Sequence, residues 1–177
     1  MPNVLKLLKK YHETLSRTAP KKIAAGFVLG MFLGLLPLSI NSVIILVLIF
    51  AVYNDKTTSL LAALIFGALG FAIDPLAHRL GLAALQASFL RGAWTVIYNL
   101  PFLPFTGFNN SIVMGNTLIG IVLAVPGAFL VRHLVLQYRG SPAQAKVEAF
   151  LRNKLVSGLT AGFKLLDWRT LFIRKPQ

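Results

Sequence analysis

The sequence predicts an all-α integral membrane protein with two full transmembrane helices, two proline-broken re-entrant hairpins and flanking basic amphipathic helices. Of its 177 residues, 56% are hydrophobic and 13% are charged, whereas a soluble domain carries about 25% charged residues. The uncharged residues form long runs, and prolines interrupt them. The basic residues lie almost entirely outside these runs. These three observations argue against a soluble domain.

The charge distribution divides the chain into three regions. Residues 1–22 and 132–177 hold 15 of the 18 lysines and arginines, and residues 23–131 hold the other three. Basic ends around an uncharged middle are the positive-inside pattern of a membrane protein with both termini in the cytoplasm. We therefore expect a basic amphipathic N-terminal helix, a membrane domain and a basic amphipathic C-terminal region over these three ranges. Because the net charge of +13 is concentrated at the ends, we expect no nucleic-acid partner.

The uncharged run over residues 23–54 predicts the first broken hairpin. As a single helix, its 32 residues would measure about 48 Å, which exceeds the hydrocarbon core of about 30 Å. Pro37 lies near the middle of the run and removes a backbone donor. The run therefore predicts two short helices, over 23–36 and 39–53, that fold back on each other. Inside a membrane, such a break needs other protein or a wet cavity to satisfy its backbone groups.

The next uncharged run, over residues 57–73, predicts the first full span. Its length is the minimum for crossing the hydrocarbon core, and Asp74-Pro75 would end it. Asp74 would then be the N-cap of a following helix with Pro75 at its first position, or else a proton-relay carboxylate, because acidic groups at membrane depth are usually functional. Residues 76–91 would form a helix in the far interface.

The last uncharged run, over residues 92–131, predicts a second broken hairpin and then the second full span. Pro101 and Pro104 prevent its first half from forming one continuous helix. Its second half, 111–131, is long enough to span, with a bend expected at Pro126. Each half of the membrane domain would thus be a broken hairpin followed by a span. This is the plan of an inverted-topology repeat, although chance similarity between apolar segments would look the same.

Small residues mark helix-packing faces in two of the expected helices. Gly26, Gly30 and Gly34 recur every fourth residue, and Gly67 and Gly70 form a second small-residue site. Glycine allows close backbone approach, which stabilises helix pairs in lipid, where the hydrophobic effect does not. Three interpretations stay open: packing against another helix of the same chain, homo-oligomerisation, or a groove that admits lipid.

Polar and helix-breaking residues at apolar depth are the candidate functional residues. In one interpretation they cap half-helices and bond the carbonyl groups that proline leaves free. In the other, they form a polar midplane site where the two hairpin tips meet and where half-helix N-termini face an anionic head group. Asn116 also lies at this depth. The candidate residues are Pro37, Ser39, Asn41, Asp74, Pro75, Asn99, Pro101, Pro104, Asn109 and Asn110.

The sequence contains no motif that is typical of an enzyme or of a metal or cofactor site, so we expect no catalytic activity and no cofactor. The chain has no cysteine and only three histidines, and it contains no catalytic triad, paired carboxylates or glycine-rich nucleotide loop. The two basic ends are amphipathic instead, and such helices bind anionic leaflets. The residues expected at the lipid surface are Lys9, Lys10, Lys21, Lys22, Lys154, Lys164 and Trp168.

The segment "PKKIAAGFVLGMFLGLLPLSIN" resembles an uncharacterised bacterial domain-of-unknown-function family of small inner-membrane proteins. Members share a G-x-x-x-G-x-x-x-G run that ends in proline, and Asp74-Pro75 is similar to their Asn-Pro. The resemblance implies the inner membrane of a Gram-negative envelope. Its relatives occur near glycosyltransferases and large AsmA-like lipid-transfer proteins. We therefore expect a lipid-handling or transport-associated subunit of an envelope complex, or else a structural scaffold or assembly partner with no substrate.

The predicted topology can be tested with reporter fusions. We expect fusions at residues 1, 56 and 177 to report the cytoplasm and a fusion near residue 85 to report the opposite side, because the first full span lies between residues 56 and 85. A cytoplasmic signal at residue 85 would remove the inverted-repeat argument.

Overall fold

The computed structural model describes residues 4–37 and 39–152, and every regular element within these ranges is a helix. Lys154, Lys164 and Trp168 lie outside the described residues. The chain divides into two compact units, Thr18–Val135 and a unit that combines Met1–Arg17 with Leu136–Gln177. Each unit is described here by itself.

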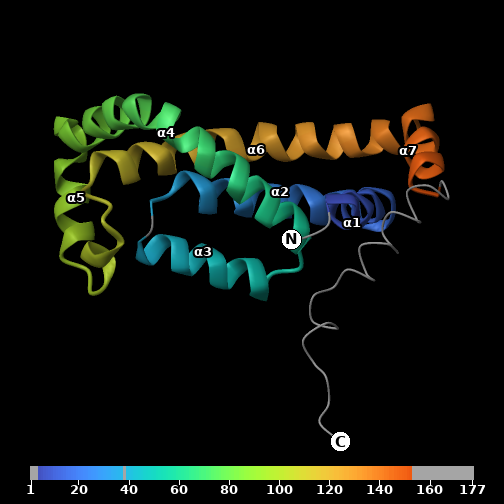
Figure 1. The fold of residues 1–177 in the computed structure, drawn as a ribbon. Helices are drawn as coiled ribbons and strands as arrows, with labels where there is room; N and C mark the ends of the chain where they lie inside the picture. The colour runs from blue at the N-terminus through green and yellow to red at the C-terminus, as the bar shows by residue number, and fades with distance from the viewer. Residues whose placement is uncertain (1–3, 38, 153–177) are drawn as a thin grey trace, which may run out of the picture. The chain divides into compact units, whose positions relative to one another are not determined.

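The larger unit contains four main helices joined by short ones (Figure 1). Two of them, α4 and α6, are long and apolar enough to cross a membrane. This confirms the predicted all-helical fold with two long apolar helices. The elements in chain order are α2 (Pro20–Leu35), α3 (Ile40–Ala51), α4 (Lys56–Gln86), the 3₁₀ turn η1 (Ser88–Leu90), α5 (Arg91–Tyr98), the 3₁₀ turn η2 (Leu103–Thr106) and α6 (Ser111–Arg139).

Helices α2 and α3 form a helix–break–helix unit at the predicted place. Leu36 has an extended backbone, with ψ of 131°, as expected for a residue before proline. Figure 1 shows α3 running back alongside α2. The start of α2 and the residues that follow α3 meet at one end of the hairpin, which we call the base. There the Asp55 amide donates to the Lys22 carbonyl at 3.1 Å. The Asp55 carboxylate then caps α4 by accepting from the Thr58 amide.

The glycines of α2 lie directly against the backbone of α4. A Cβ atom on Gly26 would meet the Asp55 carbonyl, and one on Gly30 would meet the Ser59 carbonyl. A Cβ atom on Gly34 would meet the carbonyl of Ala63 and the amide of Gly67. Because the contact advances along both helices in the same sense, α2 and α4 are parallel.

The expected helix boundary at Asp74-Pro75 is wrong, because α4 continues through both residues to Gln86. The separate interfacial helix expected over 76–91 is therefore also wrong. Proline removes one helical hydrogen bond, but tertiary contacts hold the second half of α4 in place. There, Ala77 and Gly81 approach the backbone of α6 at Ser111 and Gly115 so closely that a Cβ atom on either glycine would collide with the other helix.

Helix α6 returns antiparallel to α2 and extends beyond the predicted span to Arg139. Its Gly120 faces the ring of Phe32, and its Gly127 faces the ring of Phe27. It also continues through Pro126. Between α4 and α6, the short helix α5 runs crosswise at the end of the unit (Figure 1). With only eight residues, α5 is much shorter than the helices of the first hairpin.

The smaller unit joins the two basic ends of the described chain. It contains α1 (Val4–Arg17), the last residues of α6 and α7 (Pro142–Arg152). His12 Nδ1 is hydrogen-bonded to the Tyr138 hydroxyl at 2.8 Å, and Arg139 Nε donates to the Leu15 carbonyl at 2.8 Å. Lys9 and Lys10 lie in α1.

The contact between α2 and α4 predicts that a glycine-to-alanine substitution costs more stability on α2 than on α4. Gly30→Ala places a methyl group against backbone atoms of α4, so we expect it to lower the free energy of unfolding by about 1–3 kcal/mol. A Cβ atom on Gly67 would make only an ordinary contact, at 3.8 Å from the Gly34 carbonyl. Gly67→Ala should therefore change stability by less than about 0.5 kcal/mol. Denaturant unfolding in detergent micelles measures both, and equal losses would contradict the contact.

Candidate functional site

The two helix breaks of the larger unit meet at one hydrogen bond. Asn41 lies in the first turn of α3, and its Nδ2 atom donates to the carbonyl of Thr106 in η2 at 2.7 Å. The two residues are 65 positions apart in the chain. The structure thus brings together the first break, at Pro37, and the second, at Pro104.

The first break satisfies several of its own polar groups. The Ser42 hydroxyl donates to the Pro37 carbonyl at 2.7 Å, and the Leu36 amide donates to the Phe32 carbonyl at 3.0 Å. The Ser39 hydroxyl, in contrast, is buried and has no hydrogen-bond partner in the described part of the chain. A buried hydroxyl without a partner costs free energy, so the packing around the break must offset this cost in addition to the hydrogen bonds that the break itself makes.

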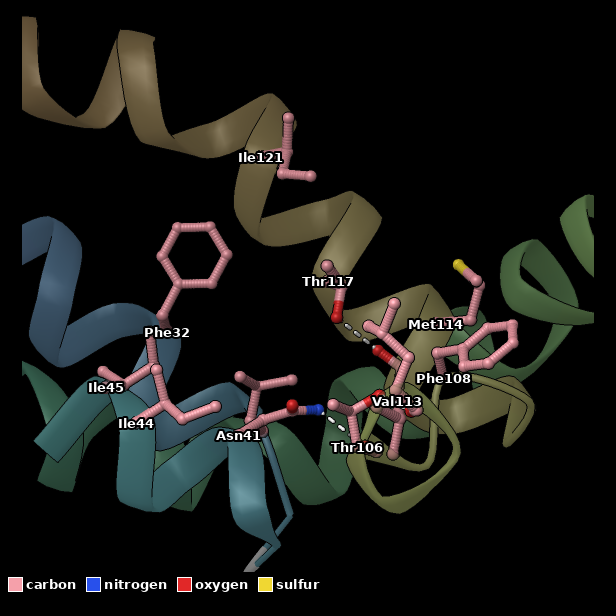
Figure 2. A pocket seen from close by; sticks show the side chains of 12 residues that line it. Phe32, Asn41, Ile44, Ile45, Thr106, Phe108, Val113, Met114, Thr117 and Ile121 are labelled. Carbon is pink, nitrogen blue, oxygen red and sulfur yellow. Dashed lines mark hydrogen bonds between the residues drawn. The ribbon is translucent and has the colours of Figure 1, made fainter. Parts of the chain in front are cut away.

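A cavity of about 400 Å³ lies where the breaks meet. Figure 2 shows its walls converging from α2, α3, the η2 loop and α6. The polar side chains in the wall are turned to protein carbonyl groups: Asn41 to Thr106, Thr106 to Leu103 and Thr117 to Val113. None of the described residues that line it is charged. The remaining lining residues are Phe32, Leu36, Ile44, Ile45, Leu103, Phe108, Val113, Met114 and Ile121.

The other candidate residues of the second break serve local structure. Asn110 accepts from the Ile112 amide at 2.8 Å at the start of α6. Asn99 donates to the Thr95 carbonyl at 2.8 Å at the end of α5. Asn109 is exposed and makes no side-chain hydrogen bond within the described residues. Pro101 is exposed in the turn between α5 and η2, and Pro104 lies within η2.

Asp74 is not a helix cap, which corrects the expected role. It lies inside α4, where its carboxylate accepts from Asn116 Nδ2 of α6 at 3.0 Å. Asn116 is fully buried, and its Oδ1 atom has no partner among the described residues. Nearby, His78 Nδ1 is hydrogen-bonded to the Ser111 hydroxyl at 2.6 Å. Two polar pairs therefore flank the close contact between α4 and α6.

The base of the larger unit carries a cluster of basic and aromatic residues. Lys22 Nζ lies 3.2 Å from the centre of the Tyr53 ring, and Lys56 Nζ lies 5.3 Å from that of Phe50. Lys21 is exposed beside them. In each pair the ammonium group lies over the face of the ring, which stabilises the cation. Lys22 lies near the start of α2 and Phe50 near the end of α3, so the cluster lies at the end of these two helices opposite to the cavity.

Sequence patterns did not identify the contact glycines Gly81 and Gly115 or most of the cavity wall. Each glycine follows another small residue by four positions, Ala77 before Gly81 and Ser111 before Gly115, and this small-x-x-x-small spacing is the signal that could have marked them. Phe32 and Thr117 look like ordinary residues of apolar helices. The role of these two depends on how α2, α3, η2 and α6 meet in space, which the sequence alone does not specify.

No protein-family model, no curated protein and no solved structure matches this chain. The resemblance of this chain to a bacterial inner-membrane family therefore stays a prediction.

The bond between the breaks predicts a specific loss of stability. Asn41→Ala removes the donor to Thr106 and leaves that carbonyl at apolar depth, so we expect it to lower the free energy of unfolding by about 1–2 kcal/mol. Asn109→Ala is the matched control, because its side chain is exposed and unbonded in the described structure, and it should have little effect. If Asn41→Ala leaves the free energy of unfolding unchanged, the two breaks are not coupled.

Proposed function

We propose that this chain is a polytopic inner-membrane protein in which α4 and α6 span the bilayer, α2 and α3 form a re-entrant hairpin, and the cavity between the breaks admits a lipid acyl chain. Its role would be that of a lipid-handling subunit of an envelope complex. The observation that carries the proposal is the apolar cavity at the junction of the two breaks.

Exposed apolar side chains support membrane insertion. Phe71 of α4 and Val122 of α6 are 85% and 71% exposed, and α3 presents Val47 and Phe50 in the same way. Apolar patches of this extent are rare on soluble monomers. Along α4, no charged residue occurs between Lys56 and Asp74, a distance of about 27 Å. This matches the hydrocarbon thickness of about 30 Å.

Helix directions support the re-entrant geometry. The hairpin begins and ends at the base, where Lys22 and Asp55 are hydrogen-bonded. With 12 residues, α3 is about 18 Å long, which is too short to cross the core. Arg132 of α6 lies toward the same base, because α6 runs antiparallel to α2. By the positive-inside rule, this base faces the cytoplasm.

The chemistry of the cavity favours an acyl chain as its occupant. Its volume falls within the usual range of about 300–1,000 Å³ for ligand sites. Its polar groups are largely occupied by protein partners, and its wall is continuous with the exposed apolar faces of α3 and α6, which include Ile44 and Ile121. At this depth the surrounding solvent would be hydrocarbon, so lipid tails are the molecules that can reach the opening.

A structural scaffold with no substrate is the alternative. The tight backbone contacts of α2 with α4 and of α4 with α6 favour it, since they make a rigid bundle suited to holding a partner. Anionic lipids at the basic base and a large AsmA-like lipid-transfer protein are the partners expected on the resemblance. Retention of lipid in the cavity distinguishes the two roles.

Filling the cavity tests the proposal. Protein reconstituted with phosphatidylglycerol carrying a photoreactive acyl chain should cross-link at residues 103–121, as mapped by mass spectrometry. Thr117→Trp places a large ring in the cavity and should reduce these cross-links to background. Val122→Trp, on an exposed position of the same helix, should leave them unchanged. Equal cross-linking in both variants would exclude the cavity as the site of the acyl chain. No cross-linking in the unmodified chain would favour the scaffold role.

A further inference from the structure

A second cavity adjoins the first at the far end of the larger unit. It has a volume of about 360 Å³ and is lined by residues of α4, α5 and the segment before α6. Phe108 contributes to the walls of both cavities. The two spaces therefore share one wall residue.

Three aromatic residues line the second cavity, and their rings contact one another. The ring centres of Trp94 and Phe108 are 6.2 Å apart, and those of Tyr98 and Phe108 are 6.3 Å apart. Trp94 Nε1 donates to the Ala84 carbonyl at 3.1 Å, which fixes the indole against α4. Pre-positioned rings can pack against the C–H face of a sugar ring at little entropic cost.

Three polar groups without protein partners also line the second cavity. The Tyr98 hydroxyl, the Asn109 amide and Asn99 Oδ1 make no hydrogen bond within the described structure, and all three residues line this cavity. They offer both donors and acceptors. This contrasts with the first cavity, where the amide donor and both hydroxyl donors are already bonded to protein carbonyl groups.

The charge of the lining residues distinguishes between the kinds of lipid head group that could occupy the second cavity. None of the described residues that line the second cavity is basic, so a phosphate group would find no cation to pair with there. None is acidic either, so a quaternary ammonium group would find no carboxylate. An uncharged, hydroxyl-bearing group is the chemistry that remains.

The depths of the two cavities match the two ends of a lipid. The first cavity is lined from α6 by Val113 to Ile121. The second is lined from α4 by Leu85, which lies beyond Gly81 and so beyond the level where α6 begins at Ser111. The second cavity therefore extends farther from the base than Gly81 does, and in the proposed membrane setting it would lie nearer to the far head groups than the first cavity.

We infer that the second cavity binds the sugar head group of a glycolipid whose acyl chain occupies the first cavity. This inference rests on the proposed function and adds the substrate class. The aromatic rings pack against the sugar ring, while Tyr98, Asn99 and Asn109 exchange hydrogen bonds with its hydroxyl groups.

Tryptophan fluorescence in nanodiscs tests the head-group site. The chain has two tryptophans, so a Trp168→Phe background leaves Trp94 in the cavity wall as the single reporter. We expect glucosyl diacylglycerol to produce a saturable change in Trp94 emission. Phosphatidylglycerol and phosphatidylcholine with the same acyl chains should produce none. An equal response to either phospholipid, or no response to the glucolipid, would overturn the inference.

Conservative variants locate the response. Tyr98→Phe and Asn109→Ala each remove one polar group at an exposed position, and each should weaken the apparent affinity for the glucolipid by about threefold to tenfold. Val96→Ala, at an exposed position of α5 outside the cavity wall, is the control and should have no effect. Acyl-chain cross-linking in the first cavity is measured in the same samples. If acyl-chain cross-linking persists but Trp94 emission does not distinguish the glucolipid from the phospholipids, the proposed function stands and this inference fails.

Discussion

Close contact between the backbones of α2 and α4 is the constraint on which the rest of the larger unit depends. Three glycines on α2 let its backbone touch that of α4, and side chains at these positions would collide with backbone carbonyl groups. The contact is parallel. Since consecutive parallel helices need a connection that returns to the starting end, α3 must run back to the base before α4 begins. The hydrogen bond between Lys22 and Asp55 fixes that return.

The position of the break follows from this constraint. Because α2 and α3 share one base, the turn between them lies at the other end of both helices, where Asn41 reaches Thr106. In the proposed membrane setting, this is the depth at which unpaired backbone is tolerated only against protein or in a cavity. The η2 segment supplies the protein, and the space left beside it is the first cavity. The architecture and the candidate site thus have one physical origin.

The sequence predicts those features whose cause is local. The length of the run over 23–54 and the position of Pro37 were sufficient to predict two helices and the break between them. The helix boundary predicted at Asp74-Pro75 is wrong because tertiary contacts at Ala77 and Gly81 override the local signal, which is a capping residue followed by proline. The cavities required the meeting of α2, α3, η2 and α6, which no pattern within one segment encodes.

Depth measurements along α3 test the re-entrant hairpin most directly. The chain has no cysteine, so a single cysteine placed at Val43, Val47 or Phe50, all more than half exposed, can carry a spin label. Collision rates with oxygen and with a water-soluble nickel chelate then give the depth of each label in a bilayer. The account predicts the greatest depth at position 43, an intermediate depth at 47 and the least at 50. A maximum at position 47, with both neighbours shallower, would mean that this segment crosses the membrane and would contradict the hairpin.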